Sequence, residues 1–291
     1  MVMMELKKVL AIGGSDPSGG AGIQADMIAL MECAAYPYTA ITAVTAQNST
    51  GVVAFEVLCS SIVRSQVDAI IADTGIDGIK TGMLGSSENI MEAARIIGER
   101  PDIKSVIDPV TRASDGRLLT SEAATAVLKK RLLPKAFMVT PNIHEAALLS
   151  GVSIKSEDDL LQAAAIIKDT GVGWVLIKGG HFSGPVSTDL LYDGTDEYYY
   201  EALRVERDNV RGTGCMMASA ICAYLAHGFE AYDAVDRAKA YVLKKIKSAA
   251  LLGKGSLQAV PLLISEAAKS DADAVPEDSV IRSDDLEDRA D

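Results

Sequence analysis

The 291-residue sequence lacks several patterns that assign a chain to a class at once. Aromatic residues make up only 5% of it, and no apolar run approaches the roughly 18 residues that a membrane-spanning helix needs. Its first eight residues show no basic segment followed by an apolar core, the pattern of a secretion signal. We therefore expect a globular protein of the cytoplasm that has no membrane partner.

Cysteine and histidine are too few and too scattered for a structural metal site. The four cysteines form no C-x-x-C pair, and the three histidines have no zinc-type spacing. Free thiols in a reducing compartment are the expected state. The net charge of −12 repels the backbone of a nucleic acid, so we expect no nucleic acid partner.

The acidic charge is concentrated at the C-terminal end of the sequence. Residues 270–291 contain nine acids and two arginines, which gives this segment a charge of −7 and leaves −5 for the rest. Such a segment has too little apolar surface to fold by itself. We expect one domain over residues 1–262 and an acidic, flexible tail over residues 263–291.

Up to residue 260, strand patterns alternate with helix patterns. Short branched apolar runs indicate strands buried on both faces, and apolar residues spaced by three and four indicate helices. The candidate strands are 8–13, 38–45, 52–58, 76–81, 104–108, 136–140, 173–178 and 187–193. The candidate helices are 21–35, 61–73, 86–98, 120–131, 156–170, 213–227 and 230–251. This alternation predicts a three-layer α/β/α fold with a mostly parallel central sheet, whose ligands bind at the carboxyl ends of the strands.

The stretch GGSDPSGGAGIQAD at residues 13–26 follows the first strand pattern and has five glycines within ten residues. Residues 20–25 match a dinucleotide pattern, but the next strand carries no acid that could bind a ribose hydroxyl. A phosphate-binding P-loop needs lysine and then serine or threonine, and Gly20 and Ala21 stand at those positions. The remaining interpretations are a loop that closes over a small acceptor and a merely tight turn.

A second glycine site, RGTGC at residues 211–215, comes directly before a long helical pattern. Backbone N–H groups at the start of a helix have no partner within the helix, and the helix dipole helps them to attract phosphate. When phosphate is transferred, the same donors stabilise the charge of the transition state. On its own, this segment is explained equally well by an ordinary helix start that Thr213 caps.

Five motifs in a fixed order decide between these interpretations. They are GSDPSGGAGIQAD, TAQNS, PNIHEA, KGGH and GTGC. Over roughly residues 5–260 this series resembles the hydroxymethylpyrimidine/phosphomethylpyrimidine kinase family of thiamine biosynthesis, which belongs to the ribokinase-like superfamily. The resemblance implies a homodimeric kinase that uses ATP and Mg²⁺. Its substrates would be 4-amino-5-hydroxymethyl-2-methylpyrimidine and then the monophosphate of that compound.

The resemblance also implies a pocket for the acceptor. The residues that match its lining are Gly14, Ala21, Asp26 and Met83. Gln47 matches the residue that reads the pyrimidine, and a carboxamide suits this task because it offers an acceptor and a donor side by side. The acceptor and the donor of this carboxamide are complementary to the exocyclic amine and the ring nitrogen of an aminopyrimidine. Core packing explains Met83 almost equally well, and a surface turn is the alternative for Gln47.

For the phosphate donor, the resemblance implies residues at or just after strand ends. Asn142 and Glu145 match the metal-region pair, and one Glu suffices because Mg²⁺ keeps several waters beside the phosphates. Glu145 also fits the first turn of a helix, where the dipole favours an acid. Lys178 and Asp108 end buried strands, and we expect them near the phosphates and the metal.

The implied catalytic group consists of Gly212, Thr213, Gly214 and Cys215. A thiol at a helix N-terminus has a lowered pKa, so Cys215 is a candidate for the base that accepts the proton of the hydroxyl. Phosphoryl transfer depends mainly on positioning and charge stabilisation, however. We therefore expect Cys215→Ser to keep measurable activity.

Two segments depart from the pattern of the family. Arg211 stands where a histidine is common, and it would either stabilise the transferring phosphate or lie on the surface. Thr111 and Arg112 lie in an unusual lid segment, so the preference for the acceptor stays open.

Other functions are compatible with parts of this pattern. Pyridoxal kinase of the same superfamily is the main alternative, although no cysteine lies between Cys59 and Cys215, where a second one would favour it. Hydroxyethylthiazole kinase shares GTGC but matches the first motif less well. A non-catalytic pyrimidine sensor is disfavoured because Lys178, Glu145 and GTGC are all present.

Overall fold

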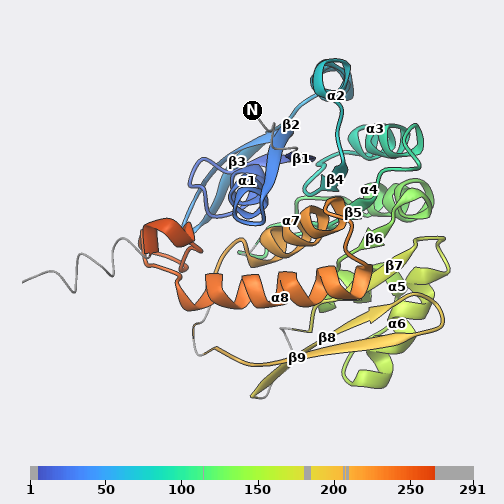
Figure 1. Cartoon of the computed structure of the whole chain (residues 1–291), viewed down its shortest axis with the longest axis vertical. Coiled ribbons are helices and arrows are strands. Elements are labelled where there is room, and N and C mark those ends of the chain that lie inside the picture. Colours follow the sequence, from blue (N-terminus) through green and yellow to red (C-terminus); the bar gives the residue numbers. More distant parts are fainter. Residues whose placement is uncertain (1–5, 114, 180–184, 206, 208–209, 266–291) are drawn as a thin grey trace, which may run out of the picture.

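The computed structural model describes residues 6–113, 115–179, 185–205, 207 and 210–265. Nine strands of this part of the chain form one sheet (Figure 1). They are β1 (Lys7–Ser15), β2 (Ala35–Asn48), β3 (Gly51–Val57), β4 (Gly78–Thr81), β5 (Ser105–Ile107), β6 (Met138–Val139), β7 (Trp174–Ile177), β8 (Val186–Tyr192) and β9 (Glu197–Leu203).

The strand order is β3-β2-β1-β4-β5-β6-β7-β8-β9. All neighbours from β2 to β7 run parallel. The pairs β2–β3, β7–β8 and β8–β9 are antiparallel and lie toward the two edges of the sheet. The parallel strands therefore present their carboxyl ends at one edge, where the fold class predicts ligands.

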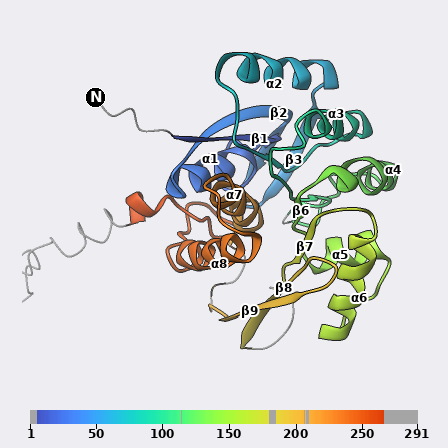
Figure 2. The ribbon, with the colours of Figure 1, turned by 45° about the vertical axis from the view of Figure 1, so that its right-hand side comes forward.

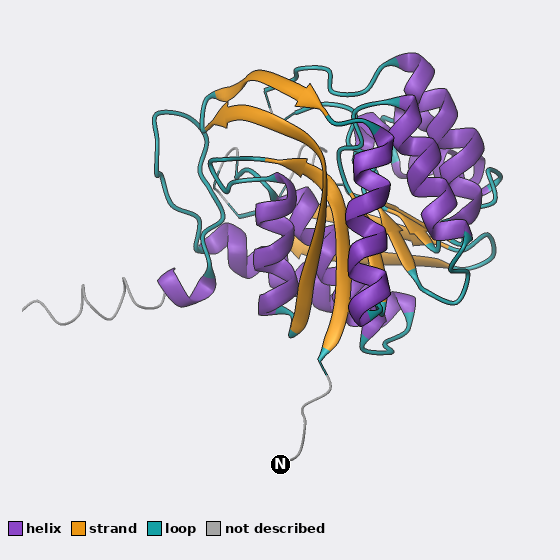
Figure 3. Cartoon of the chain, turned by 90° about the horizontal axis from the view of Figure 1, so that it is seen from above, coloured by secondary structure: helices purple, strands orange, loops and turns teal. Residues whose placement is uncertain are grey.

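Helices cover both faces of the sheet (Figures 2 and 3). One face packs against α1 (Gly22–Glu32), α7 (Thr213–Ala226) and α8 (Ala231–Lys247). The other packs against α2 (Ser60–Thr74), α3 (Ser87–Gly98), α4 (Glu122–Val127), α5 (Ile143–Ser150) and α6 (Glu157–Lys168). The three-layer α/β/α fold with a mostly parallel sheet is confirmed.

Strand β1 is fully buried in the middle of this sandwich. Val9 and Ala11 pack in the core under α1 and α7, while Leu10 and Ile12 pack in the core on the opposite face, and all four are 0% exposed. A continuous apolar run is typical of a parallel strand that is covered on both sides. Burying each of the larger side chains contributes about 2 kcal/mol, so this strand anchors the loop that follows it.

Two elements were not predicted, and several predicted elements differ in extent from the structure, such as the helix predicted over 230–251, which ends at Lys247. The unpredicted elements are α5, which has only eight residues, and the edge strand β9. The helix predicted over 120–131 ends as an α-helix at Val127. A π-helical turn (Leu128–Leu132) and a 3₁₀ turn (Leu133–Lys135) continue the chain there, because Pro134 cannot donate the hydrogen bond of a regular helix.

Two predictions extend beyond the described residues. The acidic tail predicted over 263–291 lies outside them from residue 266 onward, and so do the last two residues of the KGGH motif. Within the described part of the chain, no helix combines the length and hydropathy that a bilayer crossing requires.

Candidate active site

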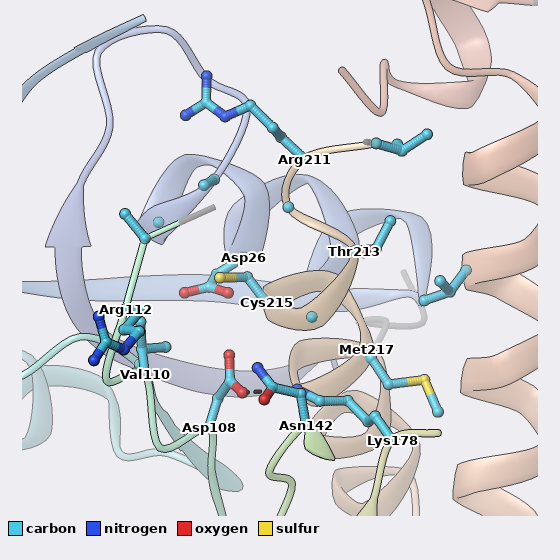
Figure 4. A pocket seen from close by; sticks show the side chains of 18 of the residues that line it. Asp26, Asp108, Val110, Arg112, Asn142, Lys178, Arg211, Thr213, Cys215 and Met217 are labelled. Carbon is cyan, nitrogen blue, oxygen red and sulfur yellow. Dashed lines mark hydrogen bonds and ion pairs between the residues drawn. The ribbon is translucent and has the colours of Figure 1, made fainter. Parts of the chain in front are cut away.

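A pocket of about 810 Å³ lies at the carboxyl ends of the parallel strands (Figure 4). This volume is typical of sites for small molecules. All thirteen residues that the sequence analysis placed in the site line the pocket. They are Gly14, Ala21, Asp26, Gln47, Met83, Asp108, Asn142, Glu145, Lys178, Gly212, Thr213, Gly214 and Cys215. Their individual roles stay predictions, but the fold brings them together.

The first glycine loop is both a tight turn and part of the pocket wall. Gly22 has a φ of +59°, and a Cβ at this position would collide with the carbonyl oxygen of Gly14. Only glycine fits such a position without strain. At Gly14 itself, an added Cβ would lie 3.0 Å from the Sδ of Met83, so Met83 packs directly against the end of β1. The loop therefore wraps tightly around the end of the first strand while it faces the pocket.

Asp26 is held in a buried ion pair at the pocket. Its carboxylate is 1% exposed and accepts hydrogen bonds from Lys80 Nζ at 2.7 and 2.8 Å and from Ser219 Oγ at 2.8 Å. Burial raises the pKa of Asp26, and the charge of Lys80 opposes this shift. Sequence reasoning missed Lys80, although a lysine within the buried strand β4 is a signal for such a pair.

The predicted donor residues form a second charged group. Lys178 Nζ lies 3.0 Å from Asp108 Oδ1, and Figure 4 shows both side chains beside Asn142. Asn142 and Glu145 cap helix α5 reciprocally, with two backbone-to-side-chain hydrogen bonds of 2.9 Å. The pKa of Glu145 is raised to about 7, mainly because the carboxyl group is buried; Lys178 opposes this shift and Asp108 adds to it. Glu145 is therefore a first-turn acid of α5 and also a pocket residue.

Helix α7 starts at the pocket without a side-chain cap. Its N-cap is Gly212, whose φ of +82° favours glycine and whose added Cβ would collide with the carbonyl oxygen of Gly20. Thr213 is the first helical residue and does not act as the N-cap, so that interpretation is wrong. An added Cβ on Gly214 would lie 3.3 Å from Lys178 Nζ. The first turn of α7 thus lies between the first glycine loop and Lys178.

The lowered pKa expected for Cys215 is wrong. Although the side chain lines the pocket and is only half-buried, its partial burial by the surrounding protein raises the pKa of the thiol to about 12. The positive charge of Lys80 lowers the pKa, but not enough to offset the loss of water. A thiol with this pKa is neutral near pH 7, so it is a poor general base.

We therefore expect Cys215→Ser to retain activity, with kcat reduced by less than about tenfold. Serine keeps the backbone N–H at this position and replaces one neutral side chain with another of similar size. Steady-state kcat with saturating ATP and acceptor tests this expectation. A loss of three orders of magnitude in a folded Cys215→Ser protein would restore the thiol as the base.

The structure also corrects the interpretation of Arg211. This side chain is 2% exposed, so it does not lie on the surface. Figure 4 shows its guanidinium directed away from Cys215, and its Nη2 lies 3.1 Å from Asp16 Oδ2. Asp16 is a pocket residue that sequence reasoning missed, because nothing in the local pattern links it to a partner 195 positions away.

The lid segment lies at the pocket, where an isolated antiparallel bridge joins Arg112 and Leu118. Asp115 accepts a hydrogen bond from the backbone N–H of Val52 at 2.8 Å, and Arg117 donates to the carbonyl oxygen of the same residue at 2.6 Å. Thr111, the other departure in this segment, is buried and lines the pocket beside Arg112. The lid is therefore fastened to β3 by two charged side chains.

Part of the pocket wall was not predicted from the sequence. Several apolar side chains of α7 and α8 line it, and these are Met217, Val242, Leu243 and Ile246. Helical apolar residues carry no local sign that separates a ligand contact from core packing. Lys239 of α8 also lines the pocket and pairs with Asp189 at 2.9 Å.

Comparison with known proteins identifies the family. The family described as Phosphomethylpyrimidine kinase matches residues 16–259. A hydroxymethylpyrimidine/phosphomethylpyrimidine kinase from Streptomyces coelicolor is 41% identical over 247 residues, which are 85% of this chain and 91% of the relative. The chain also spans half the length of a thiamine biosynthesis bifunctional protein from Geobacter sulfurreducens, again with 41% identity over 85% of this chain.

Among solved structures, an ADP complex of Bacillus subtilis pyridoxal kinase has a TM-score of 0.81 and 34% sequence identity. The similarity covers 89% of this chain and all of that one. This neighbour has the ribokinase-like fold, and it shows that a close structural relative binds an adenine nucleotide. The match across most of the described domain, with the sequence identity of the relatives, establishes that the chain is a phosphotransferase and belongs to the phosphomethylpyrimidine kinase family.

Proposed function

We propose that this chain transfers the γ-phosphoryl group of ATP to 4-amino-5-hydroxymethyl-2-methylpyrimidine and then to the resulting monophosphate. The observation that supports this most is the position of Gln47 and the first turn of α7 in one pocket. The carboxamide of Gln47 would bind the amine and ring nitrogen of the pyrimidine. The N–H groups at residues 212–215 would bind the transferring phosphoryl group.

Mg²⁺ and the phosphates of ATP would lie beside Lys178, Asp108 and Glu145. Within the described part of the chain, no cluster of three or more His, Cys, Asp or Glu could hold a metal by itself. Two carboxylates together with phosphate oxygens suit Mg²⁺, which retains several waters. The ion would neutralise phosphate charge, and the positive charge of Lys178 would add to this effect.

The residues of the chain would act mainly by positioning and by charge stabilisation. In a loose phosphoryl-transfer transition state the attacking oxygen forms little bond, so its proton does not need a strong base beforehand. A neutral Cys215 is compatible with this chemistry. Lys178 and the first turn of α7 would stabilise the negative charge on the oxygens of the migrating group.

A direct assay tests the proposal. The chain is incubated with ATP, Mg²⁺ and 4-amino-5-hydroxymethyl-2-methylpyrimidine, and phosphorus NMR follows the products over time. We expect the monophosphate to accumulate first and the diphosphate to follow. If only the monophosphate forms, the second step of the proposal is wrong, and the absence of both products overturns the whole proposal.

Pyridoxal is the alternative acceptor, because the Bacillus subtilis neighbour is a pyridoxal kinase. The ring nitrogen of pyridoxal has no neighbouring amine, so Gln47 would match it less well than an aminopyrimidine. We therefore expect kcat/KM to be higher for the pyrimidine when both acceptors are assayed side by side. Consumption of pyridoxal alone would favour the alternative.

The resemblance also predicts a homodimer, which light scattering of the purified chain measures, and a cytoplasmic location, which cell fractionation measures. We include both in the proposal. Neither affects the assignment of the pocket residues.

A further inference from the structure

A buried ion pair lies next to the residue proposed to read the pyrimidine. Arg211 and Asp16 are each 2% exposed, and Arg211 Nη2 lies 3.1 Å from Asp16 Oδ2. Both side chains line the pocket. Burying two charges is costly, and hydrophobic replacements often stabilise a protein equally well. The presence of this pair in a ligand pocket therefore calls for a reason other than stability.

Arg211 connects three segments that are far apart in the sequence. It comes from the stretch just before α7, pairs with Asp16 of the first glycine loop and donates to the carbonyl oxygen of Asn48 at the end of β2. It also lies 3.5 Å from the hydroxyl of Ser18. Since Asn48 follows Gln47 directly, the guanidinium fixes the backbone on which Gln47 is carried.

Asp16 contacts the side chain of Gln47 itself. Gln47 Nε2 donates to Asp16 Oδ2 over 3.4 Å, and Gln47 Oε1 lies 3.4 Å from the hydroxyl of Thr45. An ionised carboxylate can only accept hydrogen bonds, so the side of the amide that faces Asp16 must be the NH₂ group. The arginine keeps this carboxylate in place. The orientation of the Gln47 amide is therefore determined by the pair.

We propose that Arg211 and Asp16 form a positioning pair that fixes the amide orientation of Gln47, so that the pocket prefers a 4-aminopyrimidine to a 4-oxopyrimidine. This inference rests on the function proposed above. With NH₂ toward Asp16, the amide offers one oxygen lone pair and one N–H to the ligand. The exocyclic amine and ring nitrogen of an aminopyrimidine match this pattern.

A 4-oxopyrimidine presents the opposite pattern, a carbonyl acceptor beside a ring N–H donor. It would bind only if the amide turned over, which would place the oxygen of Gln47 against the carboxylate of Asp16. A site built to bind one hydrogen-bonding pattern rejects the opposite one strongly, because buried polar groups lose their partners. The pair would therefore set specificity without contacting the substrate.

The test compares two acceptors in three proteins. The acceptors are 4-amino-5-hydroxymethyl-2-methylpyrimidine and its 4-oxo analogue, and the proteins are the unaltered chain, Asp16→Asn and the double variant Asp16→Asn/Arg211→Gln. The amide that Asp16→Asn introduces can face Gln47 with either its oxygen or its NH₂ group. In both variants we expect the preference for the amino compound, measured as its kcat/KM divided by that of the 4-oxo analogue, to fall at least tenfold. KM for the pyrimidine should change more than kcat, and KM for ATP should not change.

A stability measurement separates positioning from folding. Asp16→Asn leaves Arg211 buried without a carboxylate, so its thermal midpoint should be lower than that of the double variant, in which neither residue is charged. We expect the double variant to recover stability but not specificity. If it recovers the preference for the amino compound as well, or if both folded variants keep that preference, the pair has only a structural role and the proposal is wrong.

A control removes another ion pair that does not line the pocket, one formed by a buried lysine and a half-buried glutamate. Lys245 of α8 lies 3.0 Å from Glu32 of α1. The variant Glu32→Gln/Lys245→Met should lose stability and keep the ratio of the two acceptors. If this ratio also falls tenfold, general loosening explains the effect and the positioning role is refuted.

An exchange of donor and acceptor tests the contact between Gln47 and Asp16 directly. Gln47→Glu places two carboxylates together, and Asp16→Asn added to it exchanges donor and acceptor across the same contact. We expect the exchange to recover at least part of the stability lost in Gln47→Glu, and no recovery would contradict the contact. The proposed function fails separately: in that case the unaltered chain phosphorylates neither pyrimidine.

Discussion

Gly214→Val should abolish turnover, with kcat at least about 1,000-fold below that of the unaltered chain. Gly214 lies in the first turn of α7, and even a single added carbon would lie 3.3 Å from Lys178 Nζ. The two methyl groups of valine would extend into the space where we place the migrating phosphoryl group. They would also displace the lysine that we expect to stabilise its charge. Steady-state kcat with saturating substrates measures the effect.

Gly214→Ala is the matched control for this experiment. Its single methyl group meets only the flexible end of Lys178, which can shift, so the loss should be much smaller than for valine. Both variants should keep the thermal midpoint within a few degrees, because the site opens into a pocket and not into the core. Near-normal turnover in a folded Gly214→Val protein would remove the first turn of α7 from the mechanism.

Lys178→Met should lower kcat by about 100-fold or more, while the fold is kept. Methionine preserves the length and apolar stem of the side chain and removes the positive charge. In the unaltered chain this charge lies 3.0 Å from Asp108 and lowers the pKa of Glu145. Without it, the two acids would face the phosphates that we place there with one less cation to balance the negative charge.

The exposed residue Lys130 provides the control, because Lys130→Met also removes one positive charge but lies outside the pocket. We expect this control to keep full activity and the same KM for ATP. Lys178→Met should also raise KM for ATP, since its charge would bind the ground-state phosphates as well. Equal activity in the two variants would show that Lys178 pairs with Asp108 for structural reasons only.

The location of the site followed from the sequence, because each motif comes at the end of a predicted strand or the start of a predicted helix. Parallel strands end at the same edge, so residues as far apart as Gln47 and Lys178 meet once the sheet forms. The motifs therefore located the pocket and thirteen of its lining residues, but not the rest of its wall. The side-chain partners of those residues were not predicted.

Side-chain pairing across the fold could not be predicted from local patterns. Asp26 meets Lys80 and Ser219, and the last of these is 193 positions away. The pKa of Cys215 was misjudged for the same reason, because the helix terminus is visible in the sequence but the partial burial of the thiol is not. Burial depends on tertiary contacts, and it outweighed the dipole here.

The two elements that the sequence did not predict, α5 and β9, have weak sequence patterns. Helix α5 has eight residues, too few for a clear period, although Asn142 and Glu145 carry the signature of its capping box. Strand β9 lies at the edge of the sheet and alternates between exposed and half-buried residues, so it lacks the apolar run that revealed the central strands.

The contact between the two glycine segments limits how the proposed double phosphorylation can proceed. Gly212 leaves no space for a methyl group beside the carbonyl oxygen of Gly20, so the loop after β1 and the start of α7 cannot shift closer together. The monophosphate is longer than the alcohol by one phosphate group. If both phosphorylation steps use the same end of α7, the pyrimidine ring of the monophosphate must bind farther from α7, or its first phosphate group must bend back toward the ring. Room for the longer acceptor would then come from another part of the pocket wall, for which Thr111 and Arg112 of the lid segment are candidates.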